Sequence, residues 1–294
     1  MNNKLSKLTH GIIKNIFYTP PLEGSICSSI IKEELEKEKP SMIARFGSVE
    51  IKAVLYPENP LLIKPLKKKT FSQMYAGGFF PCNEKTIGQF SELMIEDMKL
   101  LDVLGSWRIE ECLLQKHFPL SKRIKLSELE PYLQQDPWTE VLENKKVLVI
   151  HPFNTAIEDQ YDNNRQLLFK DSRVLPKFKS LETIKAVMIL NENDSPFEDW
   201  FAALNFMKAE IDKKDFDIAI IGCGPYGFPL AAHVKRIGKK AVHLGGATQI
   251  LFGIKGKRWI EDENFKDIIN ENFIFPSDVD KPKGFLKMDD GCYW

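Results

Sequence analysis

The sequence lacks a long hydrophobic run and a paired cysteine motif. No uninterrupted apolar stretch approaches the roughly 18 residues of a membrane span, and the first residues lack the apolar core and cleavage site of a signal peptide. The five cysteines are scattered and never spaced as CxxC, which argues against structural zinc and a disulfide framework. We therefore expect a soluble protein of the reducing cytoplasm.

An excess of one charge is also absent. Lysine plus arginine and aspartate plus glutamate number 41 each among 294 residues, so the formal net charge is zero. General nucleic-acid binders usually carry a basic excess, so we expect no nucleic-acid partner. At roughly 100–200 residues per domain, the length allows one large domain or two closely packed ones.

The first residues predict a short basic helix. Apolar residues recur at helical spacing between positions 5 and 16, with Lys4, Lys7 and Lys14 among them. Such a helix either packs on its own domain or makes a weak contact with a membrane surface. The second interpretation would place the protein at the inner face of the membrane.

Residues 1–140 form a helix-rich portion in our prediction. One strand is expected at Ser41–Phe46, and Lys67–Lys69 is expected in a solvated loop. The expected helices are Ser29–Lys39, Val49–Leu55 and Thr86–Leu101.

Residues 141–294 alternate strands with helices. The expected strands are Lys146–Ile150, Thr183–Leu190, Asp217–Ile221 and Lys240–Leu244, and the expected helices are Glu198–Ile211 and Phe228–Ile237. This alternation predicts an α/β fold with a Rossmann-like, doubly wound and mostly parallel sheet, packed with the first portion as one compact unit. The last ~25 residues are either an ordered tail or a flexible arm, and their composition leaves both open.

A glycine-rich loop joins the third of these strands to a helix. Gly222, Gly224 and Gly227 form a GxGxxG pattern that also contains Tyr226. In this context the backbone and the helix N-terminus can cradle a phosphate. The alternative is a tight turn without a ligand. A dinucleotide is disfavoured because no acidic residue follows the next strand, around His243, to hold the ribose.

A second glycine-rich segment follows the last expected strand and should reach the same sheet edge. It contains Gly245, Gly246 and Gln249, and the basic cluster Lys255, Lys257 and Arg258 comes soon after, closed by Trp259. Arginine and lysine at this spacing suit a diphosphate. The alternative is an exposed basic turn with Trp259 as a core anchor.

The segment Ala44–Glu50 (ARFGSVE) resembles the RFGDGE motif of the GT-D glycosyltransferase superfamily. Arg45, Phe46, Gly47 and Glu50 match the motif, whereas Ser48 stands at the Asp position. The family's Asp-x-Glu pair is associated with a metal and the nucleotide-sugar. One carboxylate is a poor cage for Mg²⁺ or Mn²⁺ unless the nucleotide phosphates and other residues complete it. We therefore predict no metal ligand among the residues and leave Mg²⁺ or Mn²⁺ open as a cofactor. The resemblance extends to Ala76–Pro81, His151–Tyr161 and Gly222–Trp259.

This resemblance implies a Rossmann-like glycosyltransferase of the hexosyltransferase type that uses a nucleotide-sugar, with a UDP-sugar the expected donor, in bacterial capsule, O-antigen or glycoconjugate synthesis. It implies that Arg45, Gly47 and Ser48 contact the donor. Glu50 is the first candidate to activate a glycan acceptor, the alternative being that it binds the donor's sugar or ribose hydroxyls or a metal. His151 follows a strand and is a second catalytic candidate, its alternative being a packed histidine. Two other functions stay open: an NAD(P)-dependent oxidoreductase, and a non-catalytic nucleotide-sugar-binding partner of a glycan assembly.

Overall fold

One parallel sheet of seven strands forms the centre of the computed structural model, which describes residues 19–58, 66–190, 192–282, 284–287 and 289–294. The strand order is β3-β2-β1-β7-β6-β4-β5, and all neighbouring strands are parallel. The strands are β1 (Ser41–Ala44), β2 (Val103–Ser106), β3 (Lys122–Lys125), β4 (Lys146–His151), β5 (Ser180–Lys185), β6 (Ile218–Ile221) and β7 (Lys240–His243). Strands from residues 1–140 join strands from residues 141–294 where β1 pairs with β7.

The side chains of the strands alternate between two hydrophobic cores, one on each face of the sheet. In β6, Ala219 and Ile221 enter the first core, whereas Ile218 and Ile220 enter the second. Strands that are apolar at every position are therefore buried on both faces, as the parallel arrangement requires. This confirms the predicted α/β, Rossmann-like doubly wound class.

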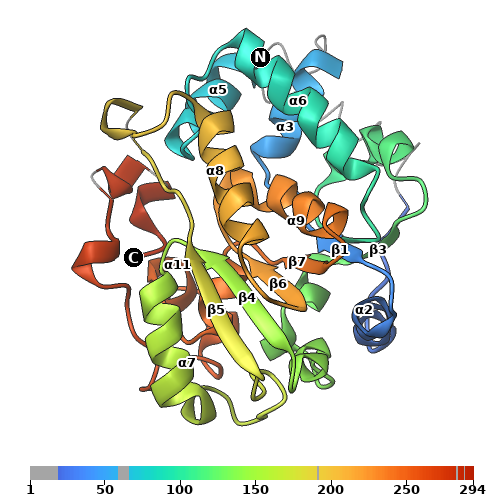
Figure 1. Cartoon of the computed structure of the whole chain (residues 1–294), viewed down its shortest axis with the longest axis vertical. Helices are drawn as coiled ribbons and strands as arrows, with labels where there is room; N and C mark the ends of the chain where they lie inside the picture. The colour runs from blue at the N-terminus through green and yellow to red at the C-terminus, as the bar shows by residue number, and fades with distance from the viewer. Residues whose placement is uncertain (1–18, 59–65, 191, 283, 288) are drawn as a thin grey trace.

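Helices cover both faces. The first core is covered by α3 (Glu50–Glu58), α5 (Lys67–Ala76), α6 (Glu84–Met98), α8 (Trp200–Asp212) and α9 (Gly227–Arg236). The second core is covered by α2 (Ile26–Glu36), α7 (Asn154–Leu168), α10 (Ala247–Leu251) and α11 (Lys257–Ile260). In Figure 1, α8 and α9 lie side by side over the central strands, and α7 runs alongside β5. No helix in the described ranges is long and apolar enough to cross a membrane.

Side-chain caps determine where two of the predicted helices begin. The Asn83 side chain accepts from the Thr86 N–H at 3.1 Å, and the Thr86 hydroxyl accepts from the Asn83 N–H, so α6 starts two residues before the prediction. Asp199 caps α8 by accepting from the Ala202 N–H at 2.7 Å. The helix expected between residues 5 and 16 lies outside the described residues.

Two strands at the periphery were missed from the sequence, and the predicted bounds of a third are wrong. Strands β2 and β3 were not expected, because β2 contains Gly105 and the outer strand β3 reads KRIK, with one buried residue. The strand predicted at Thr183–Leu190 is β5, which ends at Lys185 because its only partner, β4, ends opposite at His151.

Lys67–Lys69 were predicted in a loop and instead open α5. Lysine has a good helix propensity. The Lys67 ammonium also lies 5.5 Å from the ring centres of Tyr56 and Phe71, so its charge is placed against aromatic faces.

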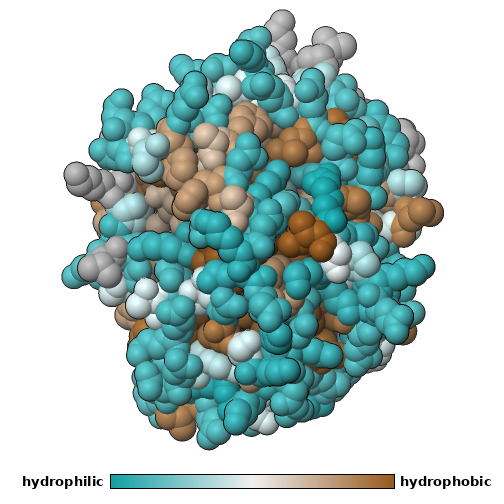
Figure 2. Space-filling view, in the orientation of Figure 1, coloured by the Kyte–Doolittle hydropathy of each residue, from teal (hydrophilic) through white to brown (hydrophobic). Residues whose placement is uncertain are grey.

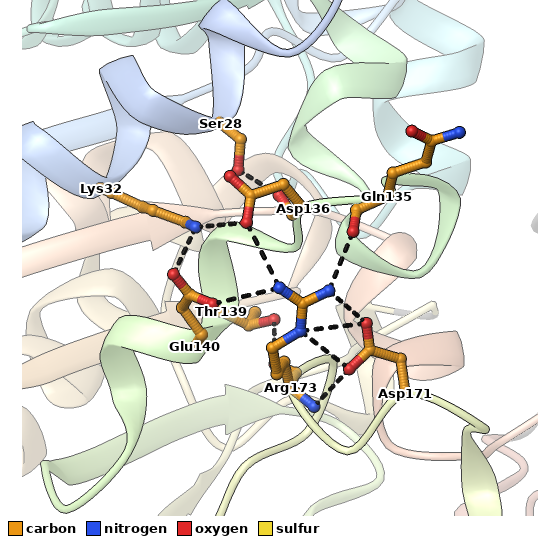
Figure 3. Close-up of polar contacts among 8 residues, drawn as sticks. All are labelled: Ser28, Lys32, Gln135, Asp136, Thr139, Glu140, Asp171 and Arg173. Atoms are coloured by element: carbon orange, nitrogen blue, oxygen red, sulfur yellow. Dashed lines mark hydrogen bonds and ion pairs between the residues drawn. The ribbon is translucent and has the colours of Figure 1, made fainter.

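A polar network joins the helix before β1 to the segments before β4 and β5 (Figure 3). Lys32 of α2 bridges Asp136 and Glu140, with its Nζ 2.7 Å from the Asp136 carboxylate. Arg173 lies 3.6 Å from both carboxylates and 2.8 Å from Asp171. Because these residues precede strands, the network braces the amino edge of the sheet and leaves the carboxyl edge to other side chains.

The loop Gly222–Gly227 has a packing reason for its glycines. A Cβ on Gly222 would lie 2.6 Å from the Gly245 carbonyl oxygen, and a Cβ on Gly227 would lie 2.1 Å from the His243 ring. Gly222 therefore lets the loop after β7 approach the end of β6 closely, and Gly227 lets α9 approach His243 of β7.

We expect Gly227→Ala to lower the free energy of unfolding by about 1–3 kcal/mol, because His243 is buried and cannot move aside without a backbone shift. Gly88→Ala is the matched control. A Cβ at Gly88, inside α6, meets nothing within 4 Å, so this substitution should stabilise the protein by about 0.4–1 kcal/mol. Urea unfolding midpoints measure both effects, and equal midpoints for the two variants would contradict the packing explanation.

Candidate functional site

Two arginines meet at the carboxyl edge of the sheet, beside the loop after β7. A Cβ on Gly245 would lie 3.2 Å from Arg45 Nη1, and a Cβ on Gly246 would lie 3.8 Å from Arg258 Nη1. Arg45 directly follows β1, and Arg258 belongs to α11. Consecutive glycines thus bring together two cations that are 213 positions apart in the chain, and we use the name arginine crevice for Arg45, Arg258 and the glycine turn beside them.

Aromatic rings hold both guanidinium groups. The Arg45 guanidinium carbon lies 5.0 Å from the ring centre of Trp107. The Arg258 guanidinium carbon lies 5.2 Å from the ring centres of both Trp259 and Tyr293. Contacts of this kind stabilise a cation without neutralising it.

The electrostatics of the crevice favour an anion. Burial lowers the pKa of Arg45, and the positive charge of Arg258 lowers it further, against the attraction of Glu50. Within the described part of the chain, neither Arg45 nor Arg258 forms an ion pair with a carboxylate. Two adjacent guanidinium groups without a bound carboxylate are an arrangement that a phosphate or diphosphate can satisfy bidentately.

Glu50 begins α3, and its carboxylate lies over the backbone of Gly47. A Cβ on Gly47 would be 1.7 Å from Glu50 Oε2, so a glycine is required for this placement. Ser48 lies in the same half-exposed turn. The predicted residues Arg45, Gly47 and Glu50 are therefore brought together with the predicted Gly245, Gly246 and Arg258.

Several residues near the crevice were not found from the sequence. Trp107 follows the unpredicted strand β2, and Glu130 follows the turn after β3. The Tyr132 hydroxyl donates to Glu130 at 2.9 Å. Burial raises the pKa of Glu130, whereas the charges of Arg258 and Arg45 act in the opposite direction. Their positions after strands could have pointed to these residues, but only if β2 and β3 had first been recognised as strands.

The last residues of the sequence are ordered against the crevice. Gln249 is buried, and its amide donates to the Tyr293 carbonyl at 2.8 Å. The Arg258 N–H donates to the Cys292 carbonyl at 3.0 Å, and Trp294 packs on Phe153. Gln249, predicted as a ligand contact, thus positions the backbone that carries Tyr293.

The GxGxxG loop offers fewer free donors than predicted. The Gly222 N–H donates to Ile150 at 2.9 Å, the Tyr226 N–H donates to Cys223 at 3.3 Å, and Pro225 has no N–H. Only Gly224 of the predicted loop residues is exposed. Tyr226, predicted to contact the ligand, instead points into the core, where its ring stacks on Trp200 at 4.8 Å. Tyr226 ends the short 3-10 turn Gly224–Tyr226 just before α9, and this turn directs its side chain toward Trp200 of α8.

His151 is buried at the end of β4. Its Nδ1 accepts from the Phe153 N–H at 3.0 Å, and burial lowers the pKa of its ring to about 3. The neutral ring accepts a hydrogen bond within the turn after β4. A ring with so low a pKa is poorly suited to accept a proton near neutral pH.

Of the predicted basic cluster, the two lysines make other contacts. Lys255 Nζ lies 5.2 Å from the Phe275 ring centre. Lys257 is exposed and pairs with Glu261 at 3.9 Å. Arg258 is the cluster member that contacts the crevice aromatics.

The donor set does not fit a divalent cation held by the protein alone. Glu50 and Ser48 offer one carboxylate and one hydroxyl, and the described residues contain no group of three or more His, Cys, Asp or Glu placed to hold a metal. The nearby carboxylate of Glu111 accepts from the Trp107 and Arg108 N–H groups.

Comparisons with known proteins add a fold likeness. No protein-family model matches the chain, and no curated protein matches it. One similar solved structure is a selenomethionine-substituted domain of unknown function 1792, with 12% sequence identity and a TM-score of 0.47. The match covers 88% of this chain and 93% of that chain. The function is therefore inferred from the site residues.

We expect acrylamide to quench mainly one of the five tryptophans. Trp107 is 43% exposed, whereas Trp138, Trp200, Trp259 and Trp294 are at most 9% exposed. Trp107→Phe should therefore abolish most of the quenching by acrylamide, measured as the slope of a Stern–Volmer plot. Trp294→Phe is the control and should keep the slope. Unchanged quenching in Trp107→Phe would show that Trp107 is covered.

Proposed function

We propose that this protein is a glycosyltransferase that binds a nucleotide-sugar, with a UDP-sugar the first candidate, in the arginine crevice. The observation that carries the proposal is the pair Arg45 and Arg258, held on both sides of Gly245–Gly246 with no carboxylate ion pair in the described ranges. The resemblance of ARFGSVE to the GT-D motif supports the same segment. It also directs the proposal toward bacterial surface polysaccharide or glycoconjugate synthesis.

The crevice suits the leaving group of sugar transfer. In this reaction the bond from the anomeric carbon to the diphosphate oxygen breaks while the acceptor oxygen bonds to that carbon. Negative charge grows on the diphosphate, and two guanidinium groups fixed by aromatic rings stabilise it without having to reorganise. Tyr293 stands beside Arg258 and is half-buried, so its ring can also stack on a base or sugar, whereas Trp259 is buried behind it.

Glu50 is the residue best placed to receive the acceptor proton. It begins α3 beside Gly47 and acts electrostatically on Arg45, so it faces the crevice from the β1 side. A carboxylate there can take the proton of the attacking hydroxyl as general base. His151 is the weaker candidate because its buried ring has a pKa lowered to about 3.

Two observations weigh against the oxidoreductase. The glycine loop that suggested a dinucleotide has packing reasons for Gly222 and Gly227, and its Tyr226 is buried. The residues after β7 are Leu244, Gly245 and Gly246, with no acid to bind a ribose. A non-catalytic nucleotide-sugar-binding role predicts the same binding without turnover, and Ser48 at the motif's Asp position is the feature that favours it.

We expect UDP to raise the melting temperature of the protein and Arg258→Gln to weaken UDP binding about 10- to 100-fold. This range corresponds to the loss of charge-assisted hydrogen bonds worth about 1.5–3 kcal/mol. Lys266→Ala is the control, because its exposed side chain pairs only with its neighbour Glu263, and it should bind UDP like the parent. A thermal-shift titration measures both, with NADH included. Stabilisation by NADH and not by UDP would replace the transferase with the oxidoreductase.

We expect Glu50→Gln to lower kcat for sugar transfer or donor hydrolysis about 10²- to 10⁴-fold, the usual contribution of a general base. UDP affinity should not fall, since the substitution removes a negative charge near the crevice. Nucleotide release from a panel of UDP-sugars measures the rate. Glu261→Gln, with a side chain that is 64% exposed, is the isosteric control. Turnover that survives Glu50→Gln would assign the proton transfer to another group.

A further inference from the structure

We infer that an open cleft beside Trp107 is a saccharide site that holds the acceptor of the proposed transfer. The inference rests on the proposed function, because the cleft is assigned as the second half of the same active site. The cleft has a volume of about 430 Å³ and is lined by Glu23, Ser106, Trp107, Lys125 and Ser127 among others. This volume falls within the range of about 300–1,000 Å³ that small-molecule sites occupy.

The lining has the composition that sugars need. Trp107 is 43% exposed. The Arg45 and Arg108 guanidinium carbons lie 5.0 and 5.2 Å from its ring centre, and the rest of the indole offers apolar surface to the C–H groups of a sugar ring. The Ser127 hydroxyl makes no hydrogen bond to the described residues, and Lys125 and Glu23 form an exposed ion pair at 3.2 Å. Hydroxyl and charged groups of both signs can donate to and accept from sugar hydroxyls.

The walls of the cleft are fixed by backbone hydrogen bonds. Leu22 forms a parallel bridge with Ile124, and its N–H donates to Arg123 at 2.9 Å while its carbonyl accepts from Lys125 at 2.7 Å. This holds Pro20–Glu23 along the outer side of β3. Figure 2 shows hydrophilic residues over most of the face in view, with hydrophobic residues in patches between them.

Trp107 connects this cleft to the arginine crevice. Its indole N–H donates to the Phe46 carbonyl at 2.9 Å, and its ring lies 5.0 Å from the Arg45 guanidinium carbon. The segment after Phe46 is the turn that places the Glu50 carboxylate over Gly47. A saccharide beside Trp107 would therefore approach Glu50 from the β2 side, while Arg258 and Tyr293 approach the crevice from the β7 side. This arrangement assigns the cleft to the acceptor and the crevice to the donor.

The test measures protection of Trp107 from acrylamide in the full chain. The probes are methyl glucoside, methyl galactoside, lactose, maltose and N,N′-diacetylchitobiose, with uridine as the nucleoside probe. We expect at least one saccharide to lower the quenching slope and uridine to leave it unchanged. Ser127→Phe, which fills the cleft, should abolish the protection. Ser72→Phe, on the exposed face of α5, is the matched control and should keep it.

The second readout is nucleotide release from UDP-sugars. Ser127→Phe should reduce the saccharide-stimulated release at least tenfold, whereas Ser72→Phe should keep both the stimulated release and hydrolysis by water. If no saccharide protects Trp107, or if Ser127→Phe keeps the stimulation, the cleft is not the acceptor site. Protection by uridine would show that the cleft binds the base of the donor, and this result would also overturn the inference. If saccharides protect Trp107 but the protein neither binds UDP nor releases nucleotide, the proposed function is wrong. The acceptor role is then wrong as well, and the cleft is a sugar-binding site only.

Discussion

The missing side chains at Gly245 and Gly246 are the constraint on which the candidate site depends. Gly245 has a φ of 64°, a left-handed conformation that other residues adopt at a cost. Arg45 fills the space beside it, and Tyr293 and Arg258 fill the space beside Gly246. Any side chain here would meet a guanidinium group or the Tyr293 ring, so the turn after β7 both ends the strand and spaces the two cations.

Two like charges in one crevice are unfavourable in the protein without its ligand. Aromatic rings on each side reduce the cost, because their negative faces attract a cation while leaving its N–H groups able to donate. Glu50 and Glu130 act on Arg45 from a distance rather than through direct ion pairs. This arrangement leaves both guanidinium groups without a carboxylate ion pair among the described residues, whereas a full salt bridge with either acid would compete with a phosphate.

Much of the central fold could be predicted from the sequence, and the parts that were missed share a physical cause. Strands β4, β6 and β7 are runs of buried aliphatic residues bounded by turns, so their pattern is local. Strand β3 has lysine or arginine at three of its four positions and is recognised only through its pairing with β2.

At the site, Arg45 and Glu50 were found from a short motif, and Arg258 from local basic spacing. Trp107 and Tyr293 were missed, because their positions depend on contacts between distant segments. Gly222 and Gly227 were recognised, yet their neighbours Gly245 and His243 give them a packing reason that a pattern cannot reveal.

The pairing of β1 with β7 has a consequence for how the chain reaches this structure. Ser41 of β1 pairs with Lys240 of β7. β1 is synthesised early, but it cannot pair with β7 until most of the chain has been made. Contacts between such distant segments close long loops and slow folding. Until β7 arrives, the edge of β1 is unpaired and open to association with other chains. Arg45 follows this strand directly, so the arginine crevice forms among the last parts of the molecule, and a partly folded chain exposes an unpaired strand edge before the crevice exists.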